Sequence, residues 1–309
     1  MGGEIFYWVL NMSIAATVTG IFIYLLGKCK KIPRKIIKTL WLAPFLRMWI
    51  PVSISGKYSL MTLLSRLATR TVTVEVPIPS PVPLPQMTMM NSAGIAATYF
   101  PVSYKVNLLE DVMKTAFLIW IAVASLILVG ILAFYILAMR DTKGAVHFTD
   151  NIYFSNKVQS PAVYGIWHPK ILIPTAYRET DLTFIILHER MHIRQKDNLL
   201  RLVWLITAAV HWFNPFVWWM LRKYLADMEL ALDERVLDAC GGEQKKAYAT
   251  ALLQNASRSP LPVSGLGGAG MRRRIENILS YTKLSFSASI AFLCLATVIL
   301  YILLTNAPV

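Results

Sequence analysis

The chain has 309 residues, of which 56% are hydrophobic and only 16% are charged, and its formal net charge is +14. This composition is too apolar for an ordinary soluble domain and indicates an integral membrane protein with room for one soluble domain. The three cysteines show no paired spacing, which argues against a disulfide framework and against a cysteine-based zinc site.

Four stretches are long and apolar enough to be predicted as transmembrane helices, at residues 5–26, 36–54, 116–139 and 286–305. The first lacks a basic start and is followed by its positive cluster, so a retained anchor fits it better than a cleaved signal peptide. The second is the weakest, because it carries Lys38, Arg47 and two prolines.

The basic residues are unevenly distributed between these spans. Residues 28–38 hold six Lys/Arg and segment 140–285 holds nineteen, together 25 of the 31, whereas segment 56–112 holds four. Because an excess of Lys/Arg marks the cytoplasmic side, both termini are predicted to lie outside the cell membrane of a bacterium, and 140–285 inside. This topology explains the net charge, and no nucleic-acid motif accompanies it, so we expect no direct nucleic-acid binding.

The spans divide the chain into five predicted parts. Residues 1–55 form the first two transmembrane helices with a basic cytoplasmic loop, and 56–115 form an extracellular loop with a proline-rich connector. The third span follows at 116–139, a cytoplasmic domain at 140–285, and the fourth span with a short outer tail at 286–309. The predicted fold is therefore mainly α, a polytopic membrane protein with an α+β domain between spans three and four.

The cytoplasmic segment begins with three short strand-like runs, NIYFS (151–155), AVYGI (162–166) and KILIP (170–174), which predict a small sheet or hairpins. A helix start is predicted at 180–183. The apolar stretch 199–221 comes next and is nearly long enough to be a fifth span. A polar helix around 227–238 and a basic amphipathic segment at 271–283 complete the domain.

The sequence HERMH, at 188–192, lies in the predicted helix and fits the HExxH pattern of zinc peptidases. His188 and His192 lie one turn apart on the same helix face, so they can bind one ion. Glu189 lies beside them and can activate a metal-bound water. The alternative is a helix with two surface histidines, but a chain with only five histidines rarely produces this pentad by chance.

A third metal ligand must come from another part of the chain. The pattern HExxHxxGxxH is absent, because the chain has Gln195 and Asn198 at its last two fixed positions. The best candidate is Glu229 on the later polar helix. Asp233, one turn further, could accept a hydrogen bond from the outer nitrogen of a ligand histidine. A solvated acidic helix face explains both carboxylates equally well.

A shared ion would constrain the path of 199–221. If this stretch crossed the bilayer, His188 and Glu229 would lie about 30 Å apart, too far for ligand distances of about 2 Å. We therefore predict that it turns back at Asn214-Pro215 or lies against the membrane, with a helix break near 195–198. His211 in this stretch could aid the transition state or bind metal, although such a histidine more often caps a turn or packs in a core.

The segments LTFIILHERMHIRQKDNLLRL, HWFNPFVWWMLRKYLADMELALDERVLDACG, SPAVYGIWHPKILIP and LRMWIPVSISGKYSL resemble the BlaR/MecR-type antirepressor membrane zinc metallopeptidases over nearly the whole chain. The resemblance implies a cytoplasmic gluzincin-like protease domain that cleaves itself and acts against a DNA-binding repressor. Sensor members carry an outer C-terminal penicillin-binding domain that detects β-lactam. This chain stops at Val309, just after the fourth span, so we do not expect it to sense β-lactam. The resemblance implies metal ligands at His188, His192 and Glu229, a base at Glu189, and support from Asp233.

We therefore predict an integral-membrane zinc endopeptidase that binds one Zn²⁺ and cleaves a cytoplasmic protein, either a transcriptional repressor or itself, in regulatory signalling. Its expected partners are that substrate and the lipid bilayer, and a homodimer is compatible with the sequence. We expect the substrate strand to pair with the edge of the small sheet, at Ala162, Val163, Tyr164, Gly165 and Ile166. The alternatives are a housekeeping protease of the HtpX or CAAX-processing type and a non-catalytic signalling protein stabilised by zinc.

Overall fold

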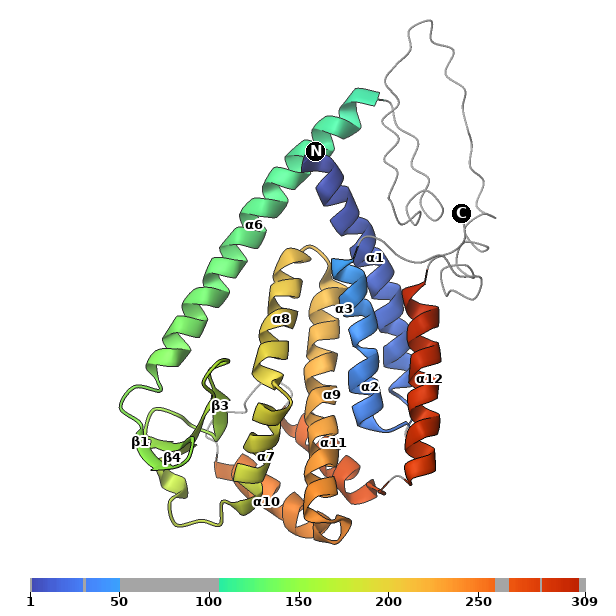
Figure 1. Ribbon diagram of the computed structural model, residues 1–309. Coiled ribbons are helices and arrows are strands. Elements are labelled where there is room, and N and C mark those ends of the chain that lie inside the picture. Colours follow the sequence, from blue (N-terminus) through green and yellow to red (C-terminus); the bar gives the residue numbers. More distant parts are fainter. Residues whose placement is uncertain (1, 30–31, 51–105, 259–266, 284, 306–309) are drawn as a thin grey trace, which may run out of the picture.

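The computed structural model describes residues 2–29, 32–50, 106–258, 267–283 and 285–305. The predicted outer loop, with its proline-rich connector, lies almost entirely outside these residues. The described chain is mainly helical, as the sequence predicts, and the helices α1, α3, α8, α9 and α12 lie side by side in one bundle (Figure 1).

Three of the described helices have the length and composition of membrane spans, namely α1 (Gly2–Leu26), α6 (Val106–Arg140) and α12 (Phe286–Leu304). Apolar side chains cover the outer surface of α6. Leu126 is 73% exposed and Phe134 is 75% exposed, which is the surface expected of a helix that faces lipid. Three of the four predicted spans therefore correspond to helices that are long and apolar enough to cross a membrane.

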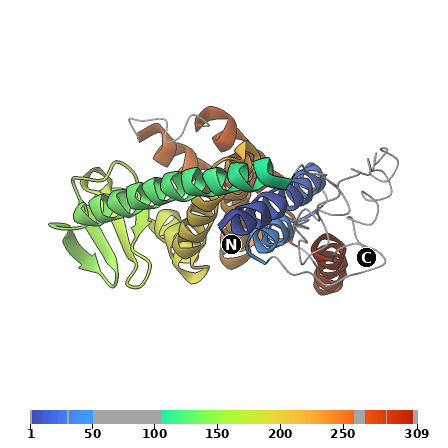
Figure 2. The same ribbon diagram turned by 90° about the horizontal axis from the view of Figure 1, so that it is seen from above.

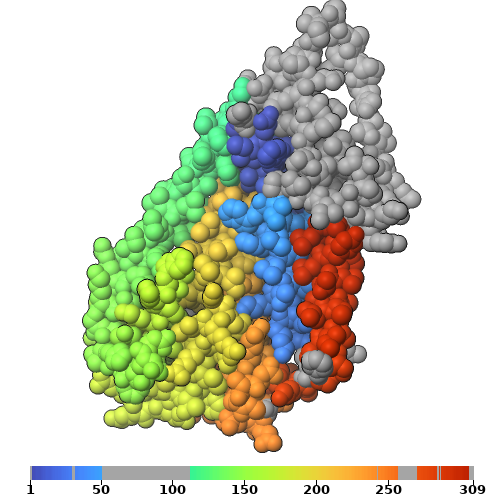
Figure 3. All heavy atoms as spheres, viewed as in Figure 1, coloured from blue at the N-terminus to red at the C-terminus, as the bar shows by residue number. Residues whose placement is uncertain are grey.

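The predicted second span, 36–54, differs in the structure. Up to residue 50, where the described residues of this segment end, it is built from two short helices, α2 (Arg34–Leu40) and α3 (Leu42–Trp49), which meet at the buried Trp41. Pro44 gives the physical reason, because a proline ring clashes with the carbonyl four residues earlier and cannot bond to it. The two helices run one after the other along α12 (Figures 1 and 3).

The apolar stretch after the HERMH helix turns back, as predicted. Helix α7 (Thr183–Arg194) ends at a break where Lys196 has φ 54°, and α8 (Asp197–Val210) then runs up to a turn at 211–214. Helix α9 (Pro215–Cys240) returns beside α8. Asn214 caps α9 by accepting a hydrogen bond from Phe216, and its amide donates to two hydroxyl groups of α1.

The small sheet has the order β1-β2-β4-β3. Strands β2 and β4 are parallel and the other two pairs are antiparallel. Its apolar face packs on α7 through a core that includes Ile171, Ile173 and Ile185. The sequence predicts three of these strands and misses β1, and the edge strand is shorter than predicted. The strands are β1 (Val146–Thr149), β2 (Ile152–Ser155), β3 (Ala162–Tyr164) and β4 (Lys170–Pro174).

Three-ten turns and two more helices complete the lower end of the molecule. Helices α10 and α11 pack with α7 and α9 around a second core that includes Leu232, Tyr248 and Ile278. Seen from above, the sheet and α12 lie at opposite ends of the molecule (Figure 2). The elements are η1 (Thr175–Tyr177), η2 (Gly242–Gln244), α10 (Lys245–Arg258) and α11 (Gly267–Ser280).

Candidate metal centre

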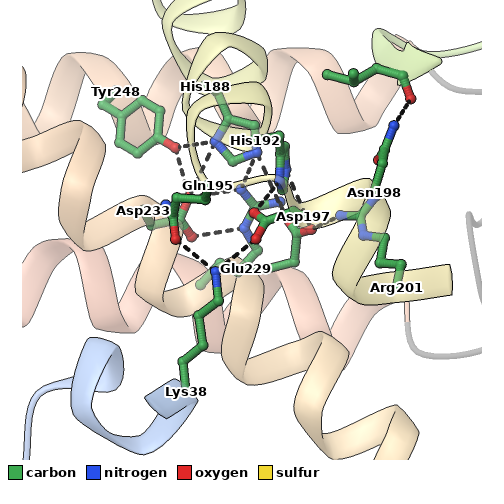
Figure 4. Close-up of polar contacts among 12 residues, drawn as sticks. Lys38, His188, His192, Gln195, Asp197, Asn198, Arg201, Glu229, Asp233 and Tyr248 are labelled. Carbon is green, nitrogen blue, oxygen red and sulfur yellow. Dashed lines mark hydrogen bonds and ion pairs between the residues drawn. The ribbon is translucent and has the colours of Figure 1, made fainter. Parts of the chain in front are cut away.

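The hairpin formed by α8 and α9 brings His188 and His192 of α7 close to Glu229 of α9 (Figure 4). The Nε2 atom of His188 lies 3.6 Å from Oε2 of Glu229, and the Nε2 atom of His192 lies 3.6 Å from Oε1. Ligands bound tetrahedrally to zinc at about 2.0–2.1 Å lie about 3.3 Å from one another. The donor atoms of the three side chains all lie within 4.8 Å of one another, so these side chains could bind a single ion after small shifts.

A hydrogen-bond chain fixes the ring of His188. The hydroxyl of Tyr248 donates to Asp233 Oδ1 at 2.6 Å, because an ionised carboxylate can only accept. The Tyr248 oxygen must then accept from the Nδ1–H of His188, at 2.8 Å. This tautomer leaves Nε2 of His188 with a lone pair for a metal ion. Burial raises the pKa of Tyr248, so its hydroxyl keeps its proton at neutral pH.

Asp233 therefore supports His188 indirectly. The sequence predicts that its carboxylate takes the outer nitrogen of a ligand histidine, but its Oδ1 lies 3.7 Å from Nδ1 of His188. The hydroxyl of Tyr248 bridges the two groups instead. Arg274 of α11 completes the group by donating to both oxygens of Asp233, at 2.7 and 2.8 Å.

His192 has its own carboxylate partner, which the sequence reasoning misses. Its Nδ1 lies 2.8 Å from Oδ2 of Asp197, so Nδ1–H donates and Nε2 remains for a metal ion. Lys38 of α2 donates to the other oxygen of Asp197 at 2.7 Å and to Gln195 at 2.6 Å (Figure 4). The Asp197 side chain has no exposed surface. The bonds from His192 and Lys38 outweigh the effect of its burial and lower its pKa.

Glu229 carries a negative charge in a strongly positive setting. Arg201 donates to its Oε1 at 2.8 Å, and Arg274 lies 3.4 Å from its Oε2. Burial alone would raise the pKa of Glu229. The positive charge of Arg274 counteracts burial, and the pKa of Glu229 lies well below its usual range. Glu229 is therefore ionised at neutral pH, as a metal ligand must be.

The two remaining predicted site residues, Glu189 and His211, lie in different parts of the structure. Glu189 is buried beside His188, and the two side chains line the same small hollow. His211 follows the far end of α8, whose fourteen residues span roughly 21 Å. Its Nε2 lies 3.2 Å from the carbonyl of Met48, so the structure does not bring His211 to the metal centre. It occupies the turn, which is the more common role for such a histidine.

The predicted substrate edge lies beside α7, and only part of it is a strand. Strand β3 is an edge strand of the described sheet and ends at Tyr164, since Gly165 has φ 89° and turns the chain away. Ile166 lies beyond that turn. The side chain of Asn198 donates to the carbonyls of Val163 and Gly165, at 2.9 and 3.1 Å. Asn198 thus fixes the edge strand beside the HERMH helix.

Two histidines one helical turn apart, with a carboxylate from a later helix and a glutamate beside the first histidine, are the donor set of a metallopeptidase centre. The chain belongs to the BlaR1 peptidase M56 family, whose model matches residues 7–278.

The names of similar proteins agree with this family assignment. The chain is similar to the regulatory protein BlaR1 of Bacillus licheniformis, with 23% identity over 54% of this chain and 30% of that protein. It is also similar to BlaR1 of Staphylococcus aureus, with 29% identity over 47% and 27% of the two chains. The methicillin resistance mecR1 protein of Staphylococcus aureus shares 26% identity over 33% and 18%. The matched part spans less than a third of each of these relatives.

Glu229→Gln tests the third ligand. The amide keeps the shape of the side chain but loses the charge. We therefore expect zinc affinity to fall by at least about 100-fold, which equals the largest effects of changing a residue that hydrogen-bonds to a metal ligand. The zinc affinity of the detergent-solubilised chain is measured by competition with a chromophoric chelator. The matched control is Glu234→Gln, a buried carboxylate on the same helix that bonds to the backbone of α2. Equal affinity in the two variants would remove Glu229 from the ligand set.

Lys38→Met tests the support of His192. Asp197 would lose its charged partner, and the ring of His192 would be less firmly held, so we expect zinc affinity to fall by about 10–100-fold. Lys35→Met is the control, because Lys35 lies on the same helix and pairs with Asp238 of α9, away from the ligands. If both variants bind zinc as the unchanged chain does, Lys38 plays no part in holding the site.

Proposed function

We propose that this chain is an integral-membrane zinc-dependent endopeptidase that cleaves a cytoplasmic protein in regulatory signalling. The observation that carries the proposal is the joint placement of His188, His192 and Glu229, with Glu189 beside them. Structural zinc sites usually close with four protein ligands. Three ligands with an adjacent glutamate favour a catalytic site over a zinc site that only stabilises the domain.

The donor set fits zinc. Two imidazoles and one carboxylate are common zinc ligands, and the hydrogen bonds at Nδ1 of both histidines leave a lone pair on each Nε2. Nη2 of Arg274 lies 3.4 Å from Nε2 of His188 and would have to give way to a bound ion. When bound, zinc would polarise the scissile carbonyl and lower the pKa of a bound water. The carboxylate of Glu189 would accept the proton of that water and pass it to the nitrogen of the leaving amine.

The distribution of charge supports a cytoplasmic position for the site. The HERMH helix, α10 and the basic helix α11 lie at the end of the molecule where α1 passes into α2 (Figure 1). The described basic residues of α2 and α11 therefore lie at the end that holds the candidate metal centre, the pattern expected at the inner face of a membrane. We propose that this end faces the cytoplasm.

The names of the relatives support a regulatory role. Two are called regulatory protein BlaR1 and one a methicillin resistance protein. We propose that the substrate is a DNA-binding repressor or the chain itself, which this family membership favours over a housekeeping protease. An extended substrate segment could add to the edge strand β3, which lies against α7.

Glu189→Gln tests the catalytic assignment. The variant lacks the base but keeps all three ligands, so it should bind zinc normally while cleavage slows by about 10²–10⁴-fold. Quantitative comparison of new protein N-termini in cells that express either version measures the loss and reveals the substrate. Unchanged cleavage in the variant would contradict the assignment. Identical N-termini with and without the chain would favour a structural zinc site.

A further inference from the structure

Helices α1 and α9 lie against each other toward the end of the molecule that holds the metal centre. A Cβ atom placed on Gly20 of α1 would lie 2.1 Å from the sulfur of Met220 of α9, so the missing side chain at Gly20 permits this close approach. One turn further along α1, the ring of Tyr24 packs edge-to-face with the indole of Trp219, with centroids 4.9 Å apart. The two helices therefore present two aromatic rings side by side.

Two ammonium groups lie over the ring of Tyr24. The Nζ atom of Lys28, just after α1, lies 5.1 Å from the ring centroid, and the Nζ atom of Lys223 on α9 lies 5.4 Å from it. A ring face attracts a cation but lacks the lone pairs that would satisfy its three N–H groups. Both lysines therefore keep donors for an anion. We call Tyr24, Lys28, Trp219 and Lys223 the α1–α9 basic cluster.

Both helices change from apolar to basic at the level of this cluster. Residues 5–26 carry no charge, and Lys28 follows them. On α9 the apolar run 216–221 is followed at once by Arg222 and Lys223. Because both changes fall beside the same tyrosine ring, the bundle leaves the apolar part of the bilayer at this level. In the cytoplasmic orientation proposed above, this is the level of the inner headgroups.

The cluster has an excess of positive charge. Within the described ranges, no carboxylate forms an ion pair with either lysine or with the exposed Arg222. The carboxylate of Asp227, one turn beyond Lys223, already accepts bonds from Trp41 and Arg273, at 3.0 and 3.1 Å. The anions available at a bilayer surface are the phosphate groups of the lipids, which attract such lysines.

An apolar surface leads away from the cluster along α1. Ile21 and Leu25 lie seven and three residues before Lys28, which places them on the same side of the helix. Ile21 is 38% exposed and Leu25 is 54% exposed. An acyl chain can therefore lie along these two residues while its own phosphate group lies at the lysines.

We propose that the α1–α9 basic cluster binds the phosphate group of a phospholipid whose headgroup has a net negative charge. Lys28 and Lys223 donate to the phosphate oxygens, and an acyl chain lies along Ile21 and Leu25. One phosphate can reach both lysines, because both ammonium groups lie within 5.4 Å of one ring centroid and their stems are flexible. The bound lipid bridges α1 to the helix that carries Glu229. The proposal goes beyond the peptidase function and does not depend on it.

Native mass spectrometry of the full chain in detergent tests this proposal. The chain is titrated with phosphatidylglycerol or with phosphatidylcholine of the same acyl chains. We expect tighter binding of phosphatidylglycerol, because the choline group of the other lipid places a positive charge beside the lysines. Lys28→Gln and Lys223→Gln should each weaken the binding of phosphatidylglycerol by about 5-fold, and the double variant by about 25-fold.

Lys245→Gln is the matched control. Lys245 also lies over a tyrosine ring, at 5.9 Å from the centroid of Tyr281, but it belongs to α10. The variant therefore loses the same charge and the same kind of contact elsewhere, and it should bind phosphatidylglycerol as the unchanged chain does. The melting temperature of each variant shows that it is folded, and the two single variants give independent readings.

A soluble phosphate separates the two sources of this chemistry. Excess glycerol 3-phosphate should leave the lipid bound, because it has no acyl chain to contact Ile21 and Leu25. Displacement of the lipid by this compound would overturn the proposal in favour of a site for soluble phosphates. Equal affinity of the unchanged chain for the two lipids, or a double variant that binds phosphatidylglycerol as tightly as the control, would also overturn it.

Discussion

The structure depends on one constraint, which is that side chains from α7 and α9 must approach within metal-ligand distance of one another. His192 and Glu229 are 37 residues apart. The chain between them is nearly apolar enough to be predicted as a membrane span. Their Nε2 and Oε1 atoms nevertheless lie 3.6 Å apart. The helix break at Lys196 and the capped turn at Asn214 make this approach possible, because a hairpin returns Glu229 to the end where α7 lies.

The site is also connected to the N-terminal helices. The backbone N–H groups of Arg34 and Lys35, at the start of α2, donate hydrogen bonds to Glu234 of α9. Trp41, just after α2, donates a hydrogen bond to Asp227 of α9. Lys38 on the same helix reaches Asp197, the partner of His192. Breaking a buried ion pair commonly costs about 3–5 kcal/mol. A shift of α2 that separated Lys38 from Asp197 would therefore weaken the support of His192. Helix α2 and the candidate metal centre are therefore linked by direct hydrogen bonds.

The sequence predicted the cluster of His188, His192 and Glu229 and the turn before α9, but it did not predict the side chains that support the two histidines. HERMH specified His188, His192 and Glu189 by helical spacing, and Asn214-Pro215 specified the turn, because both signals lie within a few residues of the feature they predict. Tyr248, Lys38 and Arg274 approach the site from three other helices, and no spacing in the sequence links them to it. Lys38 is a charged residue in a mostly apolar stretch, but the sequence alone indicates only that this stretch is a weak candidate for a transmembrane helix.

Zinc K-edge X-ray absorption on the full chain in detergent tests the central claim most directly. It reports the kind and number of atoms around the ion without any need for a substrate. We expect two imidazole nitrogens and oxygen ligands at about 2.0–2.1 Å, four-coordinate and without sulfur. A spectrum with a sulfur ligand, with three or more imidazoles, or with oxygen ligands alone would contradict a centre formed by His188, His192 and Glu229.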